Sequence, residues 1–580
     1  MRVLGINMRQ LDGHHDASAC LVDGGRIVAF AEEERFSRRK HAFGQQASYA
    51  VSYCLAQAGL TLDDVDYIAT PWFETGNAVR GPAGSNPEIS FALHPVDYES
   101  ERPPDFALDA LSLVLPGARR LPPVVHVSHH LAHAASAYRC APFEEAAILV
   151  IDGEGDRVST TIARGANGCI EPIAQFPISS SLGHFYEAVT AFIGFGHMGQ
   201  GKAMGLAPYG RPVHAFNEIK LHDESYEIDL AIDDGRCDPV RGGWRGVGAA
   251  WQVHLDRRFG PPNPSRMTID PDSMRPRDTT RWQQRELDIM ASAQLVLEKT
   301  LCHLASIAVR ESGSARLLLA GGVALNCSAN GAIRRLPFVE DLFVQPIAGD
   351  AGAALGAALE VSAWAGCDVR SDFTDVALGP AFSDDQIVSI LRGVGVSFTA
   401  PDDICDVVAR LLARDKVLGW FQGRMEGGPR ALGRRSILAP PQSEEMRDRT
   451  NDVKRRARWR PLAPAVPVEE AERLLDSLMV SPYMIVSDQV RADIRHAVPG
   501  IVHVDGSTRP QTVDRARNAP FWELLTSFQS RAGLPCVINT SFNDEAEPIV
   551  CTPYDALRTY FSTDLDALAI GSFLLCKDRG

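Results

Sequence analysis

A chain of 580 residues is too long for a single hydrophobic core, so we expect roughly two to four domains. The formal net charge of -15 at pH 7 argues against a general binder of nucleic acid or of an anionic membrane, because both usually present a positive face. The twelve cysteines contain no CxxC pair, and no apolar run reaches the roughly 18 residues of a membrane span, so we predict a cytoplasmic protein without a thiolate zinc site.

The N-terminal segment predicts a three-stranded meander. Residues 2–34 read as the apolar run RVLGIN, the polar loop HHDAS, the run ACLVD, a Gly-Gly turn and the run RIVAFAEEE. Residues 146–175 repeat this plan with AAILVIDGEGD, RVSTTIARG and CIEPIAQF, and helical segments follow each meander. Paired meanders of this kind are typical of the actin, hexokinase and acetate-kinase architecture, in which two lobes enclose a nucleotide.

The polar loop after the first strand carries His15 and Asp16, which would face such a cleft. A histidine there could act as a general base on a hydroxyl, because its pKa lies near neutral pH. The alternative is a plain loop in which Asp16 and Ser18 satisfy turn amides. Downstream, EEERFSRRKH places Lys40 among basic residues that could reach an anionic ligand or could form a solvated helix face.

The stretch SHHLAHAASAYR places His129 and His133 one helical turn apart, where two imidazoles can chelate a divalent ion. Asp152, at the end of the strand AILVID, and Asp350, at the end of LFVQPIAGD, are candidate further ligands. Two histidines with carboxylates suit iron(II), manganese or zinc. The alternative is a solvated helix start capped by Ser128, and spacing alone leaves both open.

Two glycine-containing loops could approach a ligand closely. GHMGQGKAMGLAPYG offers Lys202 as a point charge for phosphate, although it is no Walker A loop because alanine follows its GK. LLLAGGVALN runs from a strand through Gly321 and Gly322 to Asn326, where an amide-rich helix start could meet an adenosine or a phosphate. A surface loop and an ordinary strand-to-helix connection are the alternatives.

The pattern changes near residues 367–378, and the remaining 200 or so residues are enough for a separate α/β domain. This part is rich in arginine, in GRMEGGPRALGRRSILA and NDVKRRARWRPLAP. The high density of arginine indicates either a solvated basic face or a pocket for polyphosphate and acyl phosphate, since arginine binds phosphate bidentately. Nucleic acid is the other partner of such a patch, but only Trp459 could stack on a base.

The motifs together resemble those of the ATP-dependent O-carbamoyltransferases of nodulation-factor and antibiotic biosynthesis. The resemblance spans nearly the whole chain, in family order, and rests on HHDASACLVDGGRIVAFAEEERFSRRKH, HHLAHAASA, SLGHFYEAVTAFIGF, GKAMGLAPYG, AGGVALN, GDAGAALGAAL, GRMEGGPRALGRRSIL, RPLAPAV, SPYM, HVDGSTRPQTV and NTSFNDEAEPIV. So many ordered matches favour the metal interpretation of the histidines.

The resemblance implies an α/β protein with an actin/acetate-kinase-like, two-lobed domain over residues 1–366 and a YrdC-like α/β domain over residues 367–580. It implies that the C-terminal domain makes carbamoyl adenylate from carbamoyl phosphate and ATP, with Mg²⁺, and releases pyrophosphate. The N-terminal domain would then transfer the carbamoyl group to a hydroxyl and release AMP. Nucleic acid and membranes are not expected partners, and a homodimer is compatible with these features.

By resemblance, the chain's motif residues take three roles. Iron(II) or a similar divalent metal would be held by His129, His133, Asp152 and Asp350, and His15 with Asp16 would act at the acceptor. The remaining residues would bind the adenylate, ATP or carbamoyl phosphate: Lys40, Lys202, Gly321, Gly322, Asn326, Arg430, Arg435, Lys454, Arg460, Arg509, Asn539 and Ser541.

No motif marks the acceptor, which in this family is a sugar, a macrolactam, a cephalosporin or another natural product. The segments 72–122 and 244–281 are irregular and are predicted to shape its pocket. Two other functions compete with this one. A tRNA threonylcarbamoyl-type modifying enzyme would share both domain types but needs a basic surface, and an actin-like nucleotide-binding regulator would not catalyse at all.

Overall fold

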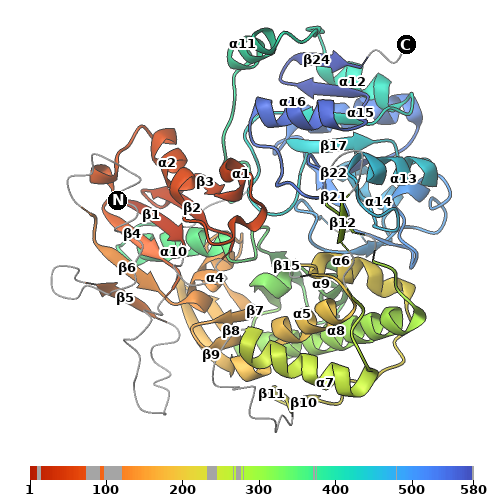
Figure 1. Ribbon diagram of the computed structural model, residues 1–580. Coiled ribbons are helices and arrows are strands. Elements are labelled where there is room, and N and C mark those ends of the chain that lie inside the picture. The colour runs from red at the N-terminus through yellow and green to blue at the C-terminus, as the bar shows by residue number, and fades with distance from the viewer. Residues whose placement is uncertain are drawn as a thin grey trace. The chain divides into compact units, whose positions relative to one another are not determined.

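The computed structural model describes residues 1–8, 15–72, 92–96, 121–196, 198–230, 244–264, 267–269, 276–278, 280–369, 373, 375–477 and 480–577 (Figure 1). The chain divides into two compact units. The N-terminal unit comprises residues 1–265 and 280–373, and the C-terminal unit comprises residues 266–279 and 374–580. The sequence placed the corresponding boundary at 366/367.

The first lobe of the N-terminal unit is built on a six-stranded sheet of order β3-β2-β1-β4-β6-β5. Its strands are β1 (Arg2–Asn7), β2 (Ser18–Asp23), β3 (Arg26–Glu32), β4 (Tyr67–Thr70), β5 (Leu93–Val96) and β6 (Val124–Val127). The predicted meander is present: β1, β2 and β3 run antiparallel, and β2 and β3 are joined by a turn at Gly24 and Gly25, both with positive φ. Strands β4 and β6 continue the sheet in parallel with β1.

The second lobe repeats this topology. Its five-stranded sheet has the order β15-β14-β7-β8-β9, so an antiparallel meander is again followed by two parallel strands. The strands are β7 (Ala146–Gly155), β8 (Val158–Ala166), β9 (Cys169–Pro177), β14 (Arg316–Ala320) and β15 (Asp341–Val344). The duplication predicted from the two sequence meanders is therefore confirmed, and with it the two-lobed actin-like layout.

Helices α4 (His129–Tyr138) and α10 (Ala351–Trp364) pack tightly between the lobes. Two glycines permit this: a Cβ on Gly5 in β1 would lie 2.0 Å from the Ala354 carbonyl oxygen, and one on Gly356 would lie 1.8 Å from that of Ala132. The other long helices of this unit are α2 (Ser48–Gln57), α5 (Leu182–Phe192), α7 (Ala249–Phe259), α8 (Gln284–Ser312) and α9 (Cys327–Arg334).

The C-terminal unit contains a seven-stranded sheet of order β21-β18-β22-β17-β16-β23-β24. Neighbouring residues of β16 (Leu418–Phe421) point to opposite faces, so Trp420 and Phe421 enter two separate cores. The other strands are β17 (Arg435–Ala439), β18 (Ala463–Pro467), β21 (Gln511–Val513), β22 (Val537–Ser541), β23 (Ala567–Ile570) and β24 (Phe573–Cys576).

Helices cover both faces of this sheet. On the Trp420 side lie α12 (Ile404–Leu412) and α15 (Ala519–Ala532). On the Phe421 side lie α11 (Asp384–Val394), α13 (Glu444–Val453) and α16 (Pro553–Ser562). The predicted class, a two-lobed α/β domain followed by a separate α/β domain, is thus confirmed.

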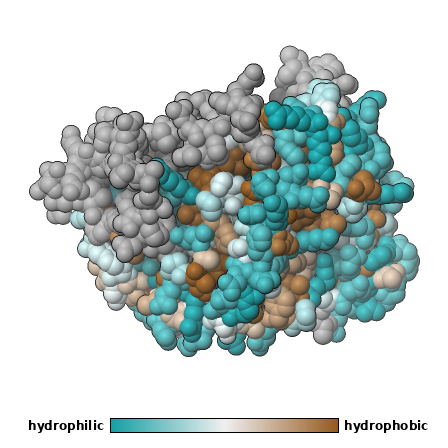
Figure 2. All heavy atoms as spheres, turned by 90° about the horizontal axis from the view of Figure 1, so that it is seen from below, coloured by the Kyte–Doolittle hydropathy of each residue, from teal (hydrophilic) through white to brown (hydrophobic). Residues whose placement is uncertain are grey.

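The face shown in Figure 2 carries mostly hydrophilic side chains, with hydrophobic ones in separate patches between them. Within the described ranges, no helix combines the length and the apolar composition needed to cross a bilayer.

Candidate active site

The two predicted histidine ligands lie on one face of α4, at the point where the chain leaves β6. His129 Nε2 and His133 Nε2 are 3.0 Å apart, and both side chains are fully buried. The helix start is stabilised by the Asp156 carboxylate, which accepts a hydrogen bond of 2.7 Å from the His129 backbone N–H. The Ser128 hydroxyl does not cap it, so the simple capped-helix alternative does not describe this segment.

Two aspartates complete the cluster. Asp152, in the last part of β7, places Oδ2 3.2 Å from His129 Nε2, and Asp350, directly before α10, places Oδ1 3.8 Å from the same nitrogen. One ligand atom from each of the four predicted residues lies within 4.8 Å of the others. Two imidazole nitrogens and two carboxylate oxygens form a donor set that suits first-row divalent metals.

Neighbouring groups orient these side chains as a metal site requires. The Pro71 carbonyl oxygen lies 3.3 Å from His129 Nδ1 and can accept a hydrogen bond from its N–H, which directs the Nε2 lone pair toward the cluster. Asp152 Oδ1 accepts a hydrogen bond of 2.8 Å from the Gly322 backbone N–H, which leaves Oδ2 to face the histidines. The indole of Trp72 stacks on the His129 ring with centroids 4.0 Å apart. The residues therefore fit a divalent cation.

The charges of the cluster also favour a cation. Burial raises the pKa of Asp350 to about 6, and the neighbouring Asp152 charge adds to this shift. Burial lowers the pKa of His133 to about 3, with a further contribution from His129, so this imidazole is neutral and able to act as a ligand. A divalent cation would relieve the repulsion between the two carboxylates.

His15 and Asp16 lie at the same site, directly before β2. Asp16 Oδ2 is 2.9 Å from His15 Nδ1, and Asp16 Oδ1 is 2.9 Å from His41 Nδ1. Burial acts to lower the pKa of His15, but the bond to Asp16 and the charges of Asp350 and Asp152 outweigh it and raise that pKa to about 9. Ser18, two residues further along, donates to the Ala351 carbonyl oxygen at 2.7 Å, which brings this loop beside Asp350.

The predicted nucleotide-binding residues of the N-terminal unit differ in their surroundings. Gly321, with φ of 91°, packs against β7, where a Cβ would lie 2.2 Å from the Ile151 carbonyl oxygen. Asn326 caps α9 by accepting from the Ala329 N–H at 3.0 Å, and its amide pairs with that of Gln294. Lys40 is exposed, next to His41, and Lys202 is half-buried in α6 (Gln200–Leu206).

In the C-terminal unit, several predicted residues meet at the end of β22. Lys454 Nζ is buried and donates to the backbone and side-chain oxygens of Ser541 and Asn543. Asn539 is fully buried and donates to Gln511 Oε1 at 2.8 Å. The hydrogen-bond partners of these amide and ammonium groups are protein oxygens, and these bonds fix the conformation at the end of β22.

The predicted arginines are not equivalent. Arg435 is fully buried, donates to four backbone carbonyl groups and lies 3.6 Å from the centroid of the Phe421 ring. Arg460 instead is part-exposed and pairs with Glu545 at 3.2 Å. Burial, together with the charges of Arg460 and Arg509, lowers the pKa of Arg456. Arg430 is half-buried in the loop before β17.

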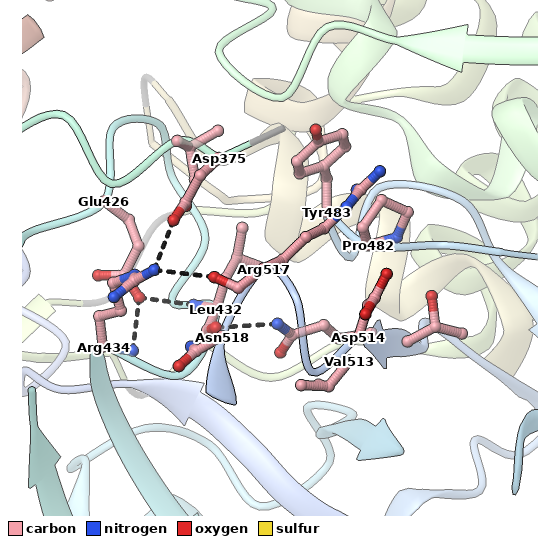
Figure 3. A pocket seen from close by; sticks show the side chains of 13 residues that line it. Asp375, Glu426, Leu432, Arg434, Pro482, Tyr483, Val513, Asp514, Arg517 and Asn518 are labelled. Atoms are coloured by element: carbon pink, nitrogen blue, oxygen red, sulfur yellow. Dashed lines mark hydrogen bonds and ion pairs between the residues drawn. The ribbon is translucent and has the colours of Figure 1, made fainter. Parts of the chain in front are cut away.

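A small pocket on the C-terminal unit is lined by Asp375, Glu426 and Arg434, among other residues. Figure 3 shows Arg434 between Asp375, 2.5 Å away, and the Arg517 carbonyl oxygen, 3.2 Å away. On the same wall, Glu426 Oε1 accepts from the backbone N–H groups of Leu432 and Arg434, at 2.9 and 2.7 Å. Glu426 therefore holds the arginine-rich loop before β17 in shape.

Three residues of these sites were not singled out from the sequence. In the sequence, His41 belongs to the basic run EEERFSRRKH, Trp72 begins an irregular segment, and no predicted role falls on Glu426. Only the alternation of charge in the motif GRMEGGPRALGRRS hinted at Glu426. The segments 72–122 and 244–281, expected to shape the acceptor pocket, lie partly outside the described residues.

Comparison with known proteins bears on both units. The family Carbamoyltransferase N-terminus matches residues 2–75, 108–237 and 265–359, and the family Carbamoyltransferase C-terminus matches residues 409–577. Among solved structures, the activator of the 2-hydroxyisocaproyl-CoA dehydratase from Clostridium difficile, with bound ADPNP, covers 63% of this chain and 96% of its own, at 14% identity and a TM-score of 0.33.

Two relatives align along almost the whole chain. Nodulation protein NolNO of Sinorhizobium fredii is 37% identical over 583 residues, which cover 97% of this chain and 79% of that protein. The uncharacterized protein sll1178 of Synechocystis is 35% identical over 623 residues, which cover 97% of this chain and 95% of that protein. The chain is thus a member of the carbamoyltransferase family.

Proposed function

We propose that this protein is an ATP-dependent O-carbamoyltransferase that uses carbamoyl phosphate and modifies a hydroxyl group of a sugar or another natural product. The observation that carries the proposal is the convergence of His15 and Asp16 with the four-residue ligand cluster in a chain of the carbamoyltransferase family. For the atoms to balance, carbamoyl phosphate, ATP, water and the alcohol give the carbamate ester, AMP, pyrophosphate and phosphate.

In the transfer step, the N-terminal unit must remove a proton from the attacking hydroxyl. His15 Nδ1 is engaged by Asp16, so Nε2 is the atom available to take that proton. Asp16 holds the ring in one orientation and stabilises the imidazolium that results. A divalent cation held by His129, His133, Asp152 and Asp350 would polarise the carbamoyl carbonyl and offset the carboxylate charge that raises the pKa of His15.

The C-terminal unit would form carbamoyl adenylate. The electrostatic interaction among the guanidinium groups of Arg456, Arg460 and Arg509 supports this role, because several such donors can bind polyphosphate and stabilise charge at a transferring phosphoryl group. Lys454 and Arg435 would contribute by shaping the strand ends around that site, since the protein already holds both side chains. Keeping both steps in one chain would protect an easily hydrolysed intermediate from water.

The test measures AMP and pyrophosphate release by the purified protein with ATP, Mg²⁺ and a divalent metal. Carbamoyl phosphate should support release, whereas threonine with bicarbonate should not. The reverse result would identify a threonylcarbamoyl-type enzyme, which the net charge of -15 disfavours. If neither donor supports release of AMP and pyrophosphate, the proposal is refuted, and a non-catalytic nucleotide-binding regulator becomes the better interpretation.

Two variants separate the half-reactions. His129→Ala should abolish transfer but leave carbamoyl-phosphate-dependent pyrophosphate exchange close to the wild-type rate, because the ligand cluster belongs to the N-terminal unit. Arg430→Ala should stop the exchange, and chemically made carbamoyl adenylate should then restore transfer. A screen of hydroxylated natural products, monitored by the mass of an added carbamoyl group, would identify the acceptor. Loss of both half-reactions in a folded His129→Ala variant would contradict the two-site mechanism.

A further inference from the structure

The Asp16 carboxylate is held between two imidazoles. Its Oδ2 lies 2.9 Å from His15 Nδ1, and its Oδ1 lies 2.9 Å from His41 Nδ1. Phe43 packs beside both rings, with each centroid 5.8 Å from that of Phe43. Each carboxylate oxygen thus has one imidazole partner, so the orientation that Asp16 offers to His15 depends on His41.

The backbone joins the same two loops. The Asp16 N–H donates to the His41 carbonyl oxygen at 2.7 Å, and the Asn7 amide donates to the Asp16 carbonyl oxygen at 2.9 Å. Asp16 and His41 have φ values of 58° and 61°, a left-handed conformation that is uncommon for side chains other than glycine. Strained residues of this kind persist where surrounding contacts hold them, and they gather at functional sites.

A buried network of ion pairs holds the backbone of His41. The His41 N–H donates to Glu34 Oε2 at 2.6 Å, and the other oxygen of Glu34 pairs with Arg35. Arg35 in turn donates to Glu32 Oε2 at 2.6 Å, and its side chain is only 4% exposed. Because Glu32 ends β3 and the two other residues lie in α1 (Glu34–Ser37), the position of His41 is tied to the rigid sheet of the first lobe.

We infer that His41 is a positioning residue, whose hydrogen bond to Asp16 Oδ1 fixes that carboxylate so that it holds His15 Nδ1 and directs His15 Nε2 into the site. The inference rests on the proposed function only in giving His15 a catalytic task. A packing role does not account for the geometry, because the His41 side chain is 31% exposed.

The experiment compares His41→Leu with His41→Asn, since the asparagine amide nitrogen occupies nearly the position of Nδ1 and can still donate to Asp16. Proteins labelled with ¹⁵N-histidine report the state of the His15 ring nitrogens by long-range ¹H–¹⁵N spectra, and the loss of a signal in His15→Gln assigns them. His222→Ala, on an exposed strand of the same unit, is the matched control. Thermal melting confirms that each variant folds, and His41→Ala replaces the leucine variant should that one unfold.

At a pH above the raised His15 pKa of about 9, where this ring is neutral, we expect wild type, His41→Asn and His222→Ala to share one pattern, that of a ring held at Nδ1 by a carboxylate. His41→Leu should show the averaged pattern of a ring that exchanges between tautomers. An unchanged His15 pattern in the leucine variant, or failure of asparagine to restore it, would overturn the inference. Because the spectra need no substrate, their outcome is independent of the proposed function: a protein with the expected spectra but no carbamoyl transfer would refute only the latter.

Discussion

Gly356 is the residue at which helix packing and the metal cluster depend most directly on each other. It lies in α10, and a Cβ added there would sit 1.8 Å from the Ala132 carbonyl oxygen and 2.8 Å from the Ser136 backbone nitrogen, both in α4. Ordinary contact begins at 3.4 Å, so in Gly356→Ala the two helices must separate by about 1.6 Å. Helix α4 carries His129 and His133, and α10 follows Asp350, so the separation divides the ligand set.

The structure sets the magnitude of both expected effects. Metal–ligand distances tolerate only about 0.2 Å of error. Mutating a group that hydrogen-bonds to a metal ligand typically weakens metal affinity by roughly 10–100-fold, so the separation of about 1.6 Å should weaken it by more. Overpacking also costs about 1–3 kcal/mol of folding free energy, and more where the obstacle is backbone. Cobalt(II) titration, followed by visible absorption, measures the first effect, and the calorimetric unfolding transition of the N-terminal unit measures the second.

Gly393→Ala is the matched control. Gly393 lies in α11 of the C-terminal unit, and a Cβ added there meets nothing within 4 Å. This substitution should leave cobalt affinity unchanged and should stabilise by about 0.5–1 kcal/mol, because alanine is the better helix former. Wild-type cobalt affinity and unfolding temperature in Gly356→Ala would refute the close packing of α4 on α10.

Three further predictions concern single side chains. Burial opposes protonation of His184, but its bonds to two flanking glutamates raise its pKa to about 9. Its stabilising contribution, roughly 3 kcal/mol, should therefore be complete below pH 6.5 and lost as pH rises through about 9, and urea unfolding of His184→Gln should lack this dependence. Trp72→Phe removes the indole that stacks on His129, so cobalt should bind about 10-fold more weakly. Fluorescence titration should also show less quenching of tryptophan emission by cobalt than in the wild type, because Trp72 is absent. Glu426→Gln should lower the unfolding free energy of the C-terminal unit by about 1–3 kcal/mol, which urea unfolding would measure, because the carboxylate accepts several backbone N–H groups.

Much of the fold could be predicted because its signals are local. The alternation of apolar runs and turn residues located β1 to β3 and β7 to β9, and the spacing of His129 and His133 gave their shared helical face. The sequence predicted Asp152 and Asp350 at the ends of strands, but β7 continues to Gly155 and β15 ends at Val344, so only the grouping of the two carboxylates agrees with the structure. These inferences require only neighbours in sequence.

The environments of the basic residues could not be predicted, because backbone carbonyl groups do not show in a sequence. Lys454 was expected to meet a substrate phosphate, yet four oxygens from Ser541 and Asn543 surround its ammonium group. Arg435 likewise donates to the carbonyl oxygens of Gln422 and Gly423, in the loop that follows β16. A charged residue beside glycines is therefore as consistent with shaping a loop as with binding a ligand.

The geometry of the candidate metal-binding cluster depends on close contacts between segments far apart in the sequence. A Cβ on Gly321 would lie 2.2 Å from the backbone of β7, so the absence of a side chain allows the two segments to approach. This approach places the Gly322 N–H within hydrogen-bond distance of Asp152. Gly356 likewise allows α4 to pack against α10, because a Cβ there would lie 1.8 Å from the Ala132 carbonyl oxygen. Because β7, α4 and α10 are brought together only by folding, the unfolded chain has no comparable site, and binding of a cation to the cluster must add to the stability of the N-terminal unit.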